Sequence, residues 1–253
     1  MRHYINISVQ MAWAQIKRDS ARNFAGFFWW IADPLIQLAL FYVIFTYVFT
    51  RSMENFLAFL FLNLVLWRWM SATIVTSAGS IVANAATIRQ VYLPKFILPL
   101  KCLIFESCNF AVALVFVVAV LVLSQVPFSA VNLLYFPLLV LVTAAFVSSS
   151  ATLAALITPY FPDLLPILRF TFRGLLFMSG VFYDPSRIPE QWRDLFFLNP
   201  FATILEMFRA VLFRGEAPDP KHVLYIAALS VPLAALAYLL HYRVDRKIVR
   251  MLY

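Results

Sequence analysis

The fold is decided by residues 107–162, which read SCNFAVALVFVVAVLVLSQVPFSAVNLLYFPLLVLVTAAFVSSSATLAALITPYFP and contain no Asp, Glu, Lys or Arg. A helix that crosses a bilayer needs about 20 apolar residues, so this run is long enough for two spans. The turn-forming residues 124–132, around Pro127, divide it. We therefore expect two membrane-spanning helices, one that begins near Ile97 and one that ends before Pro159.

The composition of the whole chain supports a membrane protein. The 253 residues are 63% hydrophobic, 17% aromatic and 13% charged, with a mean hydropathy of +0.85. Ordinary soluble domains are roughly 45 to 50% apolar and 25% charged. Spans of about 20 residues leave room for five to seven helices and little else. A cytosolic enzyme and a secreted domain are thereby excluded.

We predict an all-α, polytopic fold with six transmembrane helices in a single domain that covers residues 1–253. The expected spans are approximately 29–49, 56–80, 97–123, 133–157, 164–183 and 223–241. Between and around them lie an interface helix (1–28), a cytoplasmic segment (81–96), extracytoplasmic helices (184–220) and a cytoplasmic tail (242–253). Most of the 20 Lys and Arg fall on the side of the N-terminus, and cytoplasmic loops carry such an excess. Both termini are therefore expected to be cytoplasmic.

The residues before the first span have an amphipathic pattern. Apolar side chains fall on one helical face, namely Ile5, Val9, Ala12, Trp13 and Ile16. A helix of this kind lies along the membrane interface. It either anchors the first span or contacts a cytoplasmic partner or the incoming substrate.

Residues 83–99 form a structured segment between the second and third spans. Pro94 and Pro99 force helix boundaries after Leu93 and Leu98. An exposed Val91-Tyr92-Leu93 flanked by Arg89 and Lys95 would suit docking into a groove of another protein, because interfaces use aromatic anchors with a charged rim. The alternative is a loop folded against its own bundle.

A third unusual segment, residues 179–215, separates the fifth and sixth spans. Asn199 is typical of a helix N-cap with Pro200 at the first helical position, and Gly215 is typical of a helix end. One face then carries Phe201, Ile204, Leu205, Phe208 and Leu212. Such a helix is about 20 Å long, too short to cross a bilayer, and should dip in and return. These re-entrant helices either close the outer mouth of the bundle as a lid or brace it.

Several kinds of chemistry are missing from the sequence. The five glycines include no pair spaced for a phosphate-cradling loop, and no His-Glu-x-x-His motif occurs. Basic runs that read nucleic-acid phosphates are also absent. We therefore expect no nucleotide, cofactor or metal bound by this chain, no enzymatic activity of its own and no nucleic-acid partner.

Ionisable residues inside spans are functional candidates by default. Arg169 and Arg173 lie one turn apart and suit an anionic phosphate group, unless both extend to lipid headgroups. Arg68 is deep in its span, so it either lines an aqueous pathway or belongs to a buried ion pair. Asp33 and Glu106 are expected near the cytoplasmic face, at headgroup level.

Aromatic faces stack well on sugars, and some aromatics lie near Arg68 or in the outer half of the first span. Those that join a ring to a polar tip are candidate pathway residues. They are Tyr42, Tyr47, Trp67 and Trp69.

Three ordered motifs resemble one family. Residues 26–34, GFFWWIADP, are similar to its Leu-Gly-x-x-Trp-x-x-x-x-Pro start of the first span. Residues 84–99 are similar to its Asn-x-x-Leu-Ile-(basic)-x-Val-Tyr-(apolar)-Pro-(basic)-x-Ile-Leu-Pro segment. Residues 177–209 are similar to its Ser-Pro-(apolar)-Phe-Tyr-Pro…(apolar)-Pro-x-x-(aromatic)…Asn-Pro-(apolar)…Glu-x-(aromatic)-Arg pattern. Together they resemble the membrane subunit of ABC-2 type exporters, in particular permeases for O-antigen, capsule and teichoic-acid polysaccharides. Gly180 departs from the pattern, which has proline there, and Pro162-Asp163 stands where many relatives have Arg-Asp.

The resemblance implies an inner-membrane homodimer with two copies of a separate ABC ATPase that binds ATP and Mg, and a pore for a lipid-linked polysaccharide among the membrane lipids. ATPase coupling would fall to Arg89, Val91, Tyr92, Leu93, Pro94 and Lys95. The external gate would comprise Phe182, Tyr183, Ile188, Pro189, Trp192, Asn199 and Pro200. An ABC-2 permease for drug or lipid efflux is the alternative, and an ATP-independent channel or carrier is a third possibility.

Overall fold

The computed structural model describes residues 2–22, 26–44, 54–90, 93–127 and 129–251, and every regular element in these ranges is a helix. The principal helices are α1 (Arg2–Arg22), α2 (Gly26–Val43), α3 (Phe56–Ala83), α4 (Ala85–Gln90), α5 (Ile97–Leu123), α6 (Tyr135–Ile157), α7 (Leu164–Met178), α8 (Glu190–Phe197), α9 (Pro200–Arg209) and α10 (Pro220–Met251). The predicted all-α fold is thereby confirmed.

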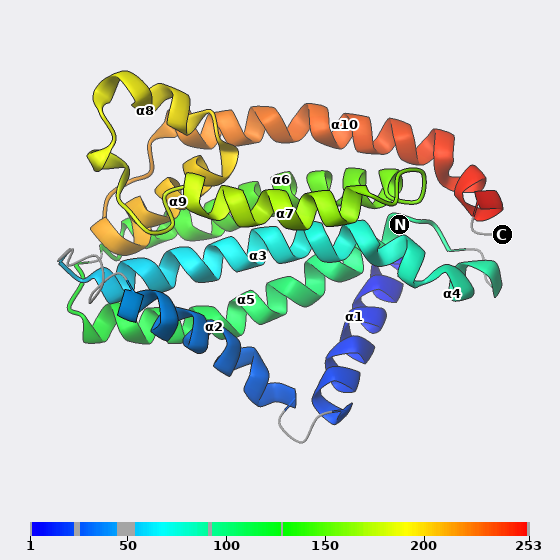
Figure 1. The fold of residues 1–253 in the computed structure, drawn as a ribbon, viewed down its shortest axis with the longest axis horizontal. Helices are drawn as coiled ribbons and strands as arrows, with labels where there is room; N and C mark the ends of the chain where they lie inside the picture. The colour runs from blue at the N-terminus through cyan, green and yellow to red at the C-terminus, as the bar shows by residue number, and fades with distance from the viewer. Residues whose placement is uncertain (1, 23–25, 45–53, 91–92, 128, 252–253) are drawn as a thin grey trace.

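Helix α3 is the centre of the bundle. It packs against α2, α5, α6, α7 and α9. In its most apolar 18-residue stretch 78% is buried inside the bundle, whereas the corresponding stretch of α10 is 17% buried. The long helices follow the long axis of the molecule, with α8 and α9 at one end and α4 at the other (Figure 1). The start of α1 and the end of α10 lie toward the α4 end.

Four helices in the described part of the chain are long and apolar enough to cross a membrane. They cover Phe56–Ala83, Ile97–Leu123, Asn132–Ile157 and Pro220–Arg243. These helices coincide with four of the predicted spans. A fifth candidate arises if the pair Glu190–Phe197 and Pro200–Arg214, bent by 105°, counts as one broken span.

The fifth predicted span is shorter than expected. We placed its end at residue 183, but α7 ends at Met178 after 15 residues, about 22 Å of helix. The physical reason is Gly180, whose φ of +71° lies in the left-handed region and cannot continue a helix. The first predicted span begins within α2, and residues 45–49 lie outside the described residues.

Helix α1 forms as predicted but does not direct all its apolar residues to one side. Ser8 and Ala12 are buried against α5, and the Ser8 hydroxyl lies 3.5 Å from the carbonyl oxygen of Ile97. Val9 and Trp13 are exposed on the molecular surface. Small residues therefore form part of the contact with the bundle, and two of the larger apolar side chains, Val9 and Trp13, face outward.

Helices α8 and α9 form a tightly bent pair whose ends match the sequence signals. The Asn199 side chain accepts a hydrogen bond from the Phe201 amide at 3.0 Å, and Pro200 holds the first helical position. A π-helical turn, Ala210–Arg214, extends α9 to Gly215, which is left-handed at φ +67°. The predicted apolar face is buried in the core. It comprises Phe201, Ile204, Leu205, Phe208 and Leu212.

The side chain of Arg209 ties α9 to the turn after α7. Its guanidinium, 0% exposed, donates to the carbonyls of Leu205, Gly180 and Tyr183 at 3.3, 3.1 and 3.5 Å. It also forms an ion pair with Glu206 at 3.4 Å. The guanidinium of Arg209 thereby holds the turn after α7 in place, although Arg209 lies 29 residues after Gly180 in the chain.

Substitution Arg209→Met tests this link. Loss of the buried cation leaves the two turn carbonyls without their donor and Glu206 with only Arg214, which costs about 3 to 5 kcal/mol and lowers Tm by at least about 6 °C. Thermal unfolding of the detergent-purified protein measures the change. The control is Arg187→Met, because Arg187 is exposed. Equal Tm values for the two variants would contradict the role of Arg209.

Candidate functional site

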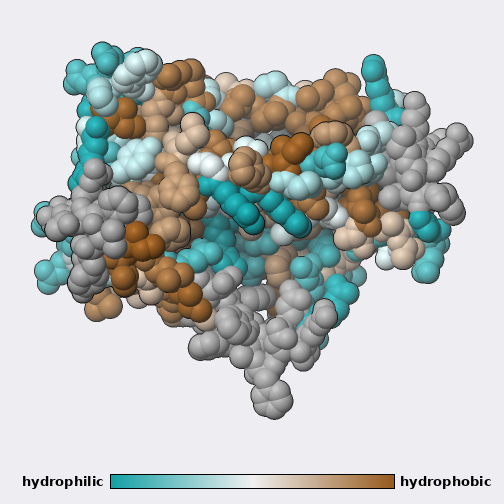
Figure 2. Space-filling view, viewed as in Figure 1, coloured by the Kyte–Doolittle hydropathy of each residue, from teal (hydrophilic) through white to brown (hydrophobic). Residues whose placement is uncertain are grey.

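Arg169 and Arg173 stand at the edge of an open groove between α3 and α7. Both side chains are exposed, one helical turn apart. The groove has a volume of about 290 Å³, and its lining consists of Trp67, Ser71, Ala72, Val75, Arg169, Phe172, Arg173 and Leu176. On this face hydrophilic side chains gather where α7 runs beside α3, and the surface below them is hollowed (Figure 2).

The wall of the groove consists of aromatic side chains and small side chains. Trp67, Ser71 and Val75 lie at four-residue intervals on one face of α3. The Trp67 ring meets the edge of Phe172 with 6.0 Å between centroids. The fold thus brings a predicted pathway residue to the predicted phosphate-binding pair. Two guanidinium groups beside an apolar wall can hold a phosphate by charge-assisted hydrogen bonds while the wall contacts apolar or sugar surfaces.

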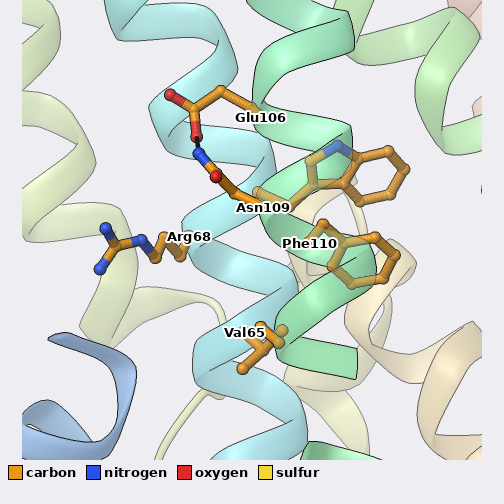
Figure 3. A pocket seen from close by; sticks show the side chains of 7 residues that line it. Val65, Arg68, Glu106, Asn109 and Phe110 are labelled. Carbon is orange, nitrogen blue, oxygen red and sulfur yellow. Dashed lines mark hydrogen bonds between the residues drawn. The ribbon is translucent and has the colours of Figure 1, made fainter. Parts of the chain in front are cut away.

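Arg68 and Trp69 line a different, smaller cavity between α3 and α5. It measures about 30 Å³, enough for one or two water molecules, and its lining comprises Val65, Arg68, Trp69, Glu106, Asn109, Phe110 and Ala113. Glu106 accepts a hydrogen bond from the Asn109 amide at 3.3 Å, and the Arg68 side chain extends away from this pair (Figure 3).

Glu106 and Trp69 both line this cavity. Glu106, which we expected at a helix end or at headgroup level, is the tenth residue of α5 and only 8% exposed. Trp69 does not face the groove, since it stacks on Phe110 at 4.5 Å and donates to the Ser107 hydroxyl at 3.1 Å. Tyr42 is half-buried beside the core, and Tyr47 lies outside the described residues.

The segment that we expected to be cytoplasmic, residues 81–96, packs more closely on the bundle than its sequence predicted. Arg89 is exposed on α4, whereas Lys95 is 0% exposed, so Lys95 does not form the charged rim predicted for it. Leu93 is half-buried and Pro94 is buried, and Val91 and Tyr92 lie outside the described residues. Phe96 contacts the rings of Tyr4 and His241, with centroids 6.0 and 5.4 Å apart. Residues 94–96 therefore fold against their own bundle, while Leu93 remains partly exposed.

The predicted gate residues separate into buried and exposed groups. Phe182 is buried between Phe41 and Phe177, at 4.6 and 5.1 Å, and Tyr183 lies 6.3 Å from Phe196. Asn199 and Pro200 are half-buried at the start of α9. Ile188 is half-buried, and Pro189 and Trp192 are exposed.

Ser179 contacts one of the predicted gate residues and was not itself selected from the sequence. Its hydroxyl accepts a hydrogen bond from the Asn199 amide at 2.9 Å, which joins the end of α7 to the start of α9. Gly180 follows in the left-handed conformation, and a Cβ there would lie 3.0 Å from Phe196. Proline, which the resembled pattern carries at this position, has φ near −65° and cannot adopt this turn.

Charges at the gate are paired. Glu206 bridges Arg209 and Arg214. Burial would raise the pKa of Asp184, but the hydrogen bonds from Ser186 and the nearby Arg209 outweigh it, so the pKa lies below its ordinary value. Asp184 is therefore ionised and caps the short turn that follows it. Among the described residues no group of three or more His, Cys, Asp or Glu could hold a metal ion.

The chain has helices long and apolar enough to cross a membrane, and comparison with known proteins identifies its class. Residues 8–213 match the ABC-2 type transporter family, so the chain belongs to this family. It is thus a membrane-embedded transport subunit, as the sequence motifs indicated.

Curated relatives include permeases named for polysaccharide export. The chain is 26% identical over 232 residues to the O-antigen export system permease protein RfbA of Myxococcus xanthus, covering 91% of this chain and 89% of that protein. It is 25% identical over 216 residues to RfbA of Klebsiella pneumoniae, covering 84% and 82%. The inner membrane transport permease YadH of Escherichia coli (strain K12) is 23% identical over 190 residues, covering 71% and 73%.

The groove is tested by replacing both of its arginines, Arg169→Gln with Arg173→Gln. Each hydrogen bond to a charged group contributes about 1.5 to 3 kcal/mol, so affinity for undecaprenyl pyrophosphate should fall at least about tenfold. Tryptophan fluorescence titration of the detergent-purified protein measures the affinity, with Arg187→Gln as an exposed control. Unchanged affinity in the double variant would remove the arginines from the site.

Proposed function

We propose that this chain is the permease subunit of an ATP-driven exporter that moves a lipid-linked, O-antigen-like polysaccharide from the cytoplasmic side across the inner membrane. The observation that carries the proposal is the groove in which Arg169 and Arg173 flank Trp67. It combines an anion-binding edge with an aromatic wall, and the chain's relatives include O-antigen export permeases.

In this proposal the arginines bind the lipid pyrophosphate. Two guanidinium forks match the oxygens of a diphosphate, and the Trp67 face suits the apolar surface of the attached sugars. The polymer then passes a pore on the axis of a homodimer, into which Arg68 and the groove both face. Helices α8 and α9 close its outer mouth in the resting state.

Energy comes from a separate ATPase subunit, two copies of which bind ATP and Mg. The chain carries no phosphate-cradling glycine loop of its own. The contact is formed by the segment from Arg89 to Leu93, with the exposed Arg89 as its cation, while Pro94 to Phe96 anchor the segment to the bundle. Motion of the ATPase would reach the spans through this anchor.

The proposed topology has six spans, with α2 and α7 as parts of the first and fifth, and both termini in the cytoplasm. The positions of the first residues of α1 and the last of α10, toward the α4 end of the bundle, support this arrangement (Figure 1). Helices α8 and α9 then lie at the extracytoplasmic end.

The contact with the ATPase is tested by Tyr92→Asp and Leu93→Asp. A carboxylate in an apolar docking surface must be desolvated, so each variant should lose co-purification with the ATPase and export. The matched control is Thr87→Asp, an exposed position on α4. Normal assembly and export in the Tyr92 and Leu93 variants would remove this segment from the mechanism.

The cargo is tested by deleting the gene in its native host and comparing surface polymer with lipid-linked polymer retained inside the inner membrane. Internal accumulation with surface loss is expected, reversed by the unmodified gene but not by the Arg169→Gln, Arg173→Gln variant. Unchanged glycan in both places would contradict polysaccharide export and leave drug or lipid efflux as the function.

A further inference from the structure

Four aromatic rings from four helices meet behind the arginine groove. Phe201 of α9 lies at its centre, with ring centroids 5.7 Å from Trp67, 5.4 Å from Phe172 and 5.8 Å from Phe146. Trp67 and Phe172 complete the cluster at 6.0 Å. All four side chains are buried, and all the ring pairs are edge-to-face. We call Trp67, Phe146, Phe172 and Phe201 the four-ring cluster.

The cluster touches the groove on one side and the gate helix on the other. Phe172 lies between Arg169 and Arg173 in the sequence of α7, with its ring directed inward and the two guanidinium groups exposed. Trp67 and Phe172 also line the groove. A ligand seated in the groove would therefore touch two rings that pack directly on Phe201.

Phe201 is fixed to the start of α9. Its amide donates to the Asn199 side chain at 3.0 Å, and the Asn199 amide donates to Ser179 at 2.9 Å. Ser179 lies seven residues after Phe172, so both fall on the same face of α7. Two contacts thus connect α9 to α7: the ring of Phe201 packs on Phe172, and Asn199 bonds to Ser179, the residue after the end of α7.

We propose that Phe172 and Phe201 are positioning residues that couple occupancy of the arginine groove to the position of the gate helix α9. The inference rests on the proposed function, because it takes the pyrophosphate of a lipid-linked glycan as the groove's ligand. Packed rings shift together, since a close-packed interior transmits displacement. By linkage, a change of α9 position also changes the affinity of the groove.

The experiment reports gate position through a cysteine at a buried site of the gate. Ala210→Cys is placed in a chain whose Cys102 and Cys108 are replaced by Ser, because Ala210 is buried at the end of α9. The full chain in nanodiscs reacts with a maleimide, with and without undecaprenyl pyrophosphate. The lipid should raise the labelling rate at least about fivefold, the lower range of coupling between two sites.

Phe201→Leu, which removes the central ring, should bind the lipid as the parent does but lose this rise in labelling. Phe172→Leu should also lose the rise, measured at a lipid concentration that saturates this variant, because Phe172 itself lines the groove. Phe201→Tyr should restore the rise. The matched control is Phe208→Leu on the same helix, since Phe208 is equally buried but contacts Phe136 at 5.9 Å instead of the cluster. It should keep the full response.

The outcomes separate this inference from the function on which it rests. Lipid binding to the parent with no rise in labelling, the same rise in the parent and in Phe201→Leu, or an equal loss of the rise in Phe208→Leu overturns the coupling and leaves the groove intact. Absence of lipid binding to the parent overturns the groove itself and the coupling with it. Should Phe201→Leu fail to fold, Phe172→Leu and Phe201→Tyr still decide between these outcomes.

Discussion

The end of the molecule formed by α8 and α9 depends on one buried cation. Water solvates a guanidinium strongly, so its burial is favourable only when acceptors replace most of that solvation. Arg209 finds them in the carbonyls of Gly180 and Tyr183, in its own helix and in Glu206. The turn after α7 and the gate helix α9 consequently stay together, because separating them would leave the cation without its acceptors. The gate is therefore one body that includes the end of α7.

The two faces of α3 contact different helices. Trp67 faces α7, where it is part of both the groove and the four-ring cluster. Trp69, two residues later, points to α5, where it stacks on Phe110. Each residue of a helix turns by about 100°, so neighbours two apart point to nearly opposite sides. The central helix thus separates a site open to ligand from a small polar cavity around Glu106.

Features that depend on local signals could be predicted from the sequence. A charge-free run and turn residues placed α5 and α6, and Asn199, Pro200 and Gly215 placed the ends of the gate helix. Features that depend on partners distant in the chain could not. The end of α7 follows from Gly180 and its contact with Arg209, and the burial of Lys95 and Glu106 follows from which side of each segment meets the bundle. The pairing of Arg169 and Arg173 was visible because both lie on one helix, whereas their aromatic wall was not.

The burial of α3 bears on how the chain is made. The Asn63 side chain donates to the carbonyl of Val181, 118 residues further along, and α3 packs chiefly on helices synthesised after it. During translation α3 must enter the bilayer with Arg68 and Asn63 still lacking these neighbours, and an arginine at the centre of a helix costs roughly 2.5 to 3.5 kcal/mol on insertion. Residues of the gate turn therefore complete the environment of a much earlier span. Substitutions in that turn would therefore leave the newly made chain incompletely packed and exposed to membrane proteases. They would lower the amount of permease in the membrane more than the activity of each molecule.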